Sequence, residues 1–282
     1  MKPLKNISLL LILLALAASP ALTYADHSWG GYHWARTANP FTLKLGDNLT
    51  SADWKSKLAQ TSQDWNSPQA FGTTSPLLTA IVNGSSSKKR CAMVAGTTQV
   101  CNGTYGKNGW LGLASIYITG GTHIKQGMAK VNDTYFNTST YNNPNERLHV
   151  MCQEIAHTFG LDHQSTNGSS QNSCMDYFSN TGANAANPLS TKPNAHDFDE
   201  LNIIYAHLDS TTTVAAMSAL AASAPEVTND PNSWGHLRSQ SANGRSSTYE
   251  RFHSDGSQTI THVYWTIEAA ANCPACDHRY DH

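Results

Sequence analysis

One stretch decides how the chain is read: Gln153-Glu154-Ile155-Ala156-His157-Thr158-Phe159-Gly160-Leu161-Asp162-His163. Gln153 and His157 are four residues apart, so on a helix their side chains lie one turn apart on one face and can reach a single ion. Glu154 is offset by one position, where its carboxylate can take a proton from water that the ion activates. Gly160 lets the chain leave the helix in a conformation that other residues resist, so that His163 can turn back as a further ligand.

The flanking sequence predicts strands and helices on both sides of this stretch. Pro144 opens the ligand helix, and a last helix begins near Asn194. Cys91 and Cys101 enclose Gly96, which fits a hairpin closed by a disulfide. Apolar and alternating segments predict strands at residues 32–36, 41–45, 77–82, 111–119 and 128–136. The first two can also be one strand that is interrupted at Pro40. Between the second and third strands, the sequence predicts a helix that ends near Asn66.

The two ends of the chain differ in composition from its centre. Residues 1–25 contain the basic, hydrophobic and small-residue parts of a secretory signal peptide, with cleavage after Ala25. A retained membrane anchor is disfavoured, because the apolar run is about ten residues and a helix needs about 20 to cross a bilayer. Residues 209–230 are rich in Ala, Ser and Thr and predict a linker. After it, residues 231–282 predict a small β region with one hairpin and a Cys-x-x-Cys tail.

The charge of the chain excludes some partners. Charged residues make up 13% of the sequence, against roughly 25% in an average soluble protein, and the formal net charge is −2. We therefore expect no nucleic acid and, after signal cleavage, no membrane as partner. Six cysteines in an exported chain favour disulfides over free thiols. Cys273 and Cys276 predict a small disulfide loop, although a second zinc or a redox centre fits the same spacing.

From about Gly31 to Leu208 the sequence resembles the metzincins, most closely the matrixin-like secreted metalloproteases. That family holds zinc with an extended His-Glu-x-x-His-x-x-Gly-x-x-His motif, and a methionine in a tight turn lies beneath the site. The resemblance implies an α+β fold for residues 26–208: a mixed twisted sheet, a ligand helix, a methionine turn and a C-terminal helix. It maps the general base to Glu154 and the last two zinc ligands to His157 and His163.

The resemblance also implies roles for residues after the motif. The methionine turn maps to Met175, and Tyr177 occupies the place of a tyrosine that in some metzincins ligates the metal or stabilises the oxyanion. The alternative for Tyr177 is simple packing. Cys152 precedes Gln153 and Cys174 precedes Met175, so in a metzincin fold a disulfide between them would tie the ligand helix to the methionine turn. The alternative is two buried free thiols.

Gln153 departs from the family motif, because it replaces the first histidine. Its amide oxygen is a weaker zinc ligand than imidazole. His149 cannot replace it, because it lies about 12 Å along the helix from His157; we expect it on the helix surface. Three outcomes stay open: Gln153 ligates weakly with Tyr177 or water in the shell, the site prefers another metal, or the chain is a pseudoenzyme. The remaining histidines are interpreted as ordinary core or surface residues: His27, His33, His123, His196, His207, His236, His253 and His262.

These observations together predict a function. We expect a secreted or periplasmic, monomeric, zinc-dependent endopeptidase that cleaves protein or peptide substrates through metal-activated water, with Glu154 as general base. The alternative is a secreted pseudoenzyme with the same shell that binds a protein or a glycan.

Overall fold

The computed structural model describes residues 27–165, 167–214 and 224–272. The predicted signal peptide and the Cys273–Cys276 loop lie outside these residues. The described chain forms one mixed sheet and several helices, so the α+β class is confirmed. Among the described residues, no helix combines the length and the apolar character that crossing a bilayer requires.

The sheet has ten strands, and eight of them follow the order β3-β2-β5-β7-β6-β10-β9-β8. Strands β3, β2, β5 and β7 run parallel to one another, whereas the pairs β7–β6, β6–β10, β10–β9 and β9–β8 are antiparallel. The two short strands β1 and β4 both pair with β7. The strand bounds are β1 His33–Trp34, β2 Phe41–Asp47, β3 Leu77–Asn83, β4 Val94–Ala95, β5 Thr97–Gly103, β6 Trp110–Thr119, β7 His123–Asn132, β8 His236–Gln240, β9 Ser246–Phe252 and β10 Gln258–Trp265.

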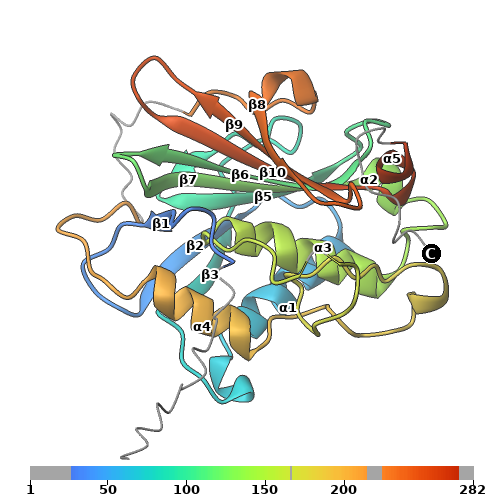
Figure 1. Cartoon of the computed structure of the whole chain (residues 1–282), viewed down its shortest axis with the longest axis horizontal. Helices are drawn as coiled ribbons and strands as arrows, with labels where there is room; N and C mark the ends of the chain where they lie inside the picture. Colours follow the sequence, from blue (N-terminus) through green and yellow to red (C-terminus); the bar gives the residue numbers. More distant parts are fainter. Residues whose placement is uncertain (1–26, 166, 215–223, 273–282) are drawn as a thin grey trace, which may run out of the picture.

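Helices α1, α3 and α4 lie on one face of the sheet (Figure 1). Each begins at a polar residue whose side chain accepts a hydrogen bond from the first helical turn: Ser51, Asn143 and Asn194. Such caps satisfy amide groups that have no partner within the helix. The α-helices are α1 Ala52–Trp65, α2 Asp133–Phe136, α3 Pro144–His157, α4 Ala195–Ile204 and α5 Ile267–Ala271, with short 3-10 turns at Pro68–Phe71, Gly182–Asn184 and Pro231–Ser233.

Buried side chains form two clusters. The larger cluster includes buried side chains of α1, α3 and α4. The smaller one contains the Cys91–Cys101 disulfide, Trp110 and Trp234. Residues of β6 enter both clusters, Leu111 and Ile116 the larger one and Trp110 and Leu113 the smaller one. A strand that contributes to both is buried along most of its length, which agrees with its apolar sequence.

The predicted hairpin between Cys91 and Cys101 is wrong, although the disulfide is confirmed. Strands β4 and β5 both pair with β7, β4 antiparallel and β5 parallel. Only one residue, Gly96, lies between β4 and β5, whereas a tight hairpin has a loop of two residues. Strand β7 also starts five residues before the predicted 128, and its predicted end is the short helix α2, which Asn132 caps.

The C-terminal hairpin forms as predicted, but it continues the central sheet. Strand β10 pairs antiparallel with β6 over the whole of its length and with β9 on its other side. The described ends of the expected linker are packed as well. Asp209 contacts Arg36, and Lys130 of β7 donates to the carbonyl of Val227. Strands β8, β9 and β10 therefore complete the same sheet that α3 packs against.

Candidate metal centre

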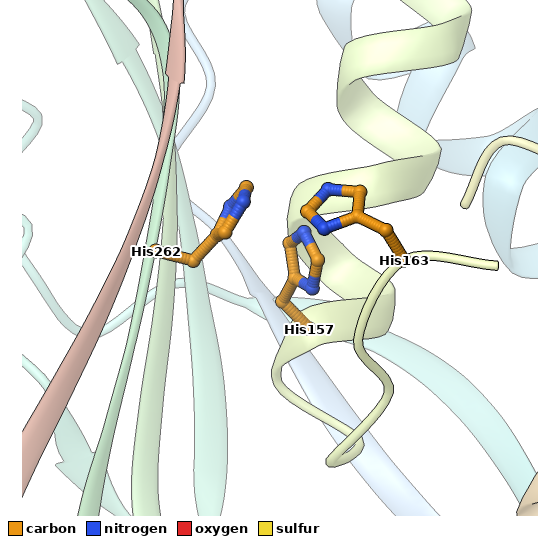
Figure 2. A group of neighbouring side chains, drawn as sticks. All are labelled: His157, His163 and His262. Carbon is orange, nitrogen blue, oxygen red and sulfur yellow. The ribbon is translucent and has the colours of Figure 1, made fainter. Parts of the chain in front are cut away.

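Three buried histidines converge between α3 and the sheet. His157 ends α3, His163 lies in the loop that follows, and His262 points toward both from the middle of β10 (Figure 2). One nitrogen of each ring lies within 4.8 Å of the others. The interpretation of His262 as an ordinary histidine is therefore wrong, because its ring belongs to this cluster.

Hydrogen bonding leaves one nitrogen of each ring free. His157 Nδ1 lies 2.8 Å from the carbonyl oxygen of Leu161, and His262 Nε2 lies 2.7 Å from the hydroxyl of Ser246. His163 Nδ1 lies 3.0 Å from a carboxylate oxygen of Asp162. The other nitrogens, Nε2 of His157 and His163 and Nδ1 of His262, are buried without a partner. Metal-binding histidines use one nitrogen for an orienting hydrogen bond and the other for the ion, so this cluster could hold a metal ion.

Burial favours the neutral form of these rings. It lowers the pKa of His157 and of His262 well below the usual value, and neighbouring imidazoles lower both further. The pKa of His163 is also lowered by burial, although the Asp162 carboxylate opposes this effect. Neutral imidazole is the form that binds a metal.

Glu154 lies beside the cluster with an unpaired carboxylate. Its side chain is fully buried, neither oxygen has a hydrogen-bond partner, and Oε2 lies 3.6 Å from His262 Nδ1. Burial raises its pKa well above the usual value. Strand β6 makes room for it at Gly112, because a Cβ there would overlap the Glu154 carboxylate. A free, desolvated carboxylate next to three unpaired imidazole nitrogens is an arrangement typical of functional sites.

The loop that returns His163 to the cluster depends on Gly160. This residue has a φ of 99°, and a Cβ would overlap the carbonyl oxygen of Tyr32, so the predicted need for glycine is confirmed. The N-terminal segment supports the loop: Trp29 donates its backbone amide to the Gly160 carbonyl, and its ring stacks on His157 with centroids 4.9 Å apart. Trp29 therefore covers one side of the cluster.

Gln153 contacts the methionine turn. Its amide nitrogen donates to the carbonyls of Cys174 and Asp176, each at 2.9 Å, and its oxygen has no hydrogen-bond partner. Only the nitrogen end of an amide can donate, so the two carbonyls fix its orientation. His149, expected on the helix surface, is fully buried, and its Nδ1 lies 3.2 Å from Asn180 Oδ1.

The turn that contains Met175 is bonded to α3 and is held from several directions. Cys152 and Cys174 form the disulfide that the family resemblance implies. Met175 is fully buried, and its carbonyl accepts the backbone amide of Gln164 at 2.6 Å. Tyr177 lies with its hydroxyl 3.2 Å from His163 Nδ1, so it contacts the ring on the side away from the free Nε2.

A cavity of about 390 Å³ opens beside Tyr177. Its lining also includes Phe178, Thr181, Asn243 and Arg245. Arg245 is buried, and its Nη2 has no hydrogen-bond partner. The three histidines do not line this cavity, but Tyr177 does, and its hydroxyl contacts His163.

One signal in the sequence could have identified His262. Ile260, His262 and Tyr264 alternate along a predicted strand, and Ile260 and Tyr264 both enter the large core. A histidine between two inward-facing residues of a strand faces the same core. Which element lies opposite is set by strand order, which one sequence does not reveal. Comparison of the chain with protein-family models and with curated proteins finds no match.

Proposed function

We propose that this chain is a secreted zinc-dependent endopeptidase whose metal is held by His157, His163 and His262. The observation that carries the proposal is the convergence of three unpaired imidazole nitrogens next to the unpaired carboxylate of Glu154. Three imidazoles suit zinc, and catalytic zinc sites keep three protein ligands and one open position. In this assignment His262 takes the place that the motif gives to Gln153.

In this proposal each residue around the centre has its own role in hydrolysis. A zinc ion held there would supply a Lewis acid and lower the pKa of a water molecule in its shell. In this proposal Glu154 accepts the proton of the attacking water and passes it to the leaving amine. The Leu161 carbonyl and the Asp162 carboxylate hold His157 and His163 in orientation.

The surroundings of the centre support a peptidase of exported origin. The Cys152–Cys174 disulfide and the Gln153 amide fix the methionine turn against α3, which keeps the floor of the site rigid. Tyr177 links the neighbouring cavity to the centre, because its side chain lines the cavity and contacts His163. Two disulfides fit an oxidising compartment outside the cytoplasm.

A second candidate is a closed metal site in a non-catalytic binding protein. Glu154, His157 and His262 are fully buried, and Trp29 stacks over His157. Structural zinc sites have four protein ligands and no open position. In this alternative Glu154 is the fourth ligand, and the metal only joins β10 to α3.

Zinc content and peptide cleavage, measured on purified variants, decide between the candidates. For the peptidase, Glu154→Gln keeps the wild-type zinc content and slows cleavage of a peptide library by about 10²-fold or more, because the general base is lost. His262→Ala loses one equivalent of zinc together with the activity. His253→Ala, on the same hairpin but outside the cluster, serves as the control and leaves both unchanged.

Two results contradict the proposal. Unchanged cleavage by Glu154→Gln removes the mechanism, and unchanged zinc content in His262→Ala removes the ligand assignment. A wild-type protein that cleaves no peptide in the library, but holds a zinc equivalent that His262→Ala loses, supports the closed site.

A further inference from the structure

We propose that His33, His207 and Asp209 form a second zinc site, completed by His123. His33 lies on β1, and His207 and Asp209 lie in the segment that follows α4. His123 is the first residue of β7. These residues share no side chain with the cluster of His157, His163 and His262. The proposal is therefore independent of the peptidase assignment.

The spacing of the ligand atoms fits one small ion. His33 Nε2 lies 3.2 Å from His207 Nε2 and 3.5 Å from Asp209 Oδ1. His207 Nε2 lies 3.7 Å from the same oxygen. A tetrahedral zinc ion with bonds of about 2.0–2.2 Å holds its ligand atoms about 3.3–3.5 Å apart. The three atoms are thus already near the separations that such an ion imposes.

His123 supplies the fourth ligand. Its Nε2 lies 3.1 Å from Asp209 Oδ1, and its ring meets His33 edge-on with centroids 5.1 Å apart. The side chain of His123 is 33% exposed and that of His207 is 56% exposed. An ion can therefore enter from solvent. His33 and Asp209 are buried beneath them.

Hydrogen bonds behind the ligands orient them. His33 Nδ1 lies 2.8 Å from the Gly31 carbonyl and donates to it, so the lone pair of this ring is on Nε2, which faces His207. Asp209 Oδ2 accepts the backbone amide of Arg36 at 3.1 Å and its guanidinium at 3.0 Å, so Oδ1 is left to face the imidazoles. Buried Arg36 is itself fixed by the Tyr205 carbonyl at 2.7 Å. Such outer partners set the direction of metal ligands.

The balance of charge also favours a metal. Arg36 already offsets the negative charge of Asp209, so three imidazoles are not needed to neutralise that carboxylate. Three imidazoles and one carboxylate suit zinc among the divalent ions. Bound there, zinc would join the segment after α4 to β1 and β7.

Titration of the metal-free protein with zinc, monitored by isothermal calorimetry, tests the second site. We expect two equivalents for the wild type, one for His207→Ala, one for His262→Ala and none for the double variant. His207 is largely exposed, so its replacement leaves the fold intact. His236→Ala, at an exposed histidine on β8, is the matched control and binds two equivalents. Visible absorption of bound Co²⁺ reports four-coordinate geometry at each site in turn.

Each outcome of the titration is decisive for one assignment. A wild-type protein that binds one equivalent, lost in His262→Ala and kept in His207→Ala, overturns the second site and leaves the first. A wild-type protein that binds one equivalent of zinc, which His207→Ala loses and His262→Ala keeps, supports the second site and contradicts the first. Binding at His207 that appears only at millimolar zinc overturns the proposal as well, since two exposed imidazoles alone would give it.

Discussion

The amide of Gln153 acts on the site through backbone carbonyls. It donates to the carbonyls on both sides of Met175, those of Cys174 and Asp176, from a fully buried position. A histidine at this position could not donate to two carbonyls while also binding a metal, since its ring has only two nitrogens. The substitution in the motif thus goes together with a different origin for the third imidazole, His262.

Replacement of Gln153 by alanine tests this role. We expect Gln153→Ala to lower the free energy of unfolding by about 2 kcal/mol or more, because two buried carbonyls lose their donor. Zinc content is expected to stay at the wild-type level. Urea unfolding and metal analysis of the same preparation measure both. Loss of one zinc equivalent with unchanged stability would show instead that Gln153 is a ligand.

Buried Lys130 links β7 to the segment that leads into β8. Its ammonium donates to the carbonyl of Val227 at 3.1 Å and to Asn229 Oδ1 at 3.3 Å, and burial lowers its pKa to about 8. An unfolded lysine has a pKa near 10.4. Between these two values the unfolded chain binds more protons than the folded one, so stability rises with pH in this window.

The variant Lys130→Met isolates this effect. The unfolding free energy of the wild type, minus that of Lys130→Met, is expected to increase between pH 8 and 10.4 by up to about 3 kcal/mol. Chemical denaturation at several pH values measures the difference. Lys89→Met, at an exposed lysine, controls for the change in net charge. A difference that stays flat across this window would mean that Lys130 titrates as it does in water.

The elements were predictable to different degrees. Helix α3 follows from Pro144, its apolar face and Gly160, and β10 follows from the alternation that ends at Trp265, because both patterns are local. Strand neighbours are not local: nothing in the sequence of β10 says that β6 lies beside it. His262 and the contacts of Asp209 were missed for this reason, since each depends on elements far apart in the chain.

The first centre brings α3 and the sheet together, because His157 ends α3, His163 lies in the loop that follows, and His262 lies on β10. Zinc at about 100 times its dissociation constant stabilises the folded state by about 2.7 kcal/mol. For a chain of this size we expect the melting temperature to fall by about 5–10 °C on chelation.

Calorimetry in the His207→Ala background measures this shift at the first centre alone. The double variant with His262→Ala is expected to melt at one temperature with or without chelator. A shift that survives in the double variant would place the stabilising metal elsewhere.

Strand β10 begins about 100 residues after α3 ends, and this separation orders events during synthesis. A ribosome completes the helix with His157 and the loop with His163 long before it reaches residue 262. Until β10 has docked on β6, the nascent protein has two of its three imidazoles and no enclosed centre. Under the proposed function, hydrolysis would therefore begin only after β10 has docked, and a copy that stops before residue 262 would lack the third imidazole.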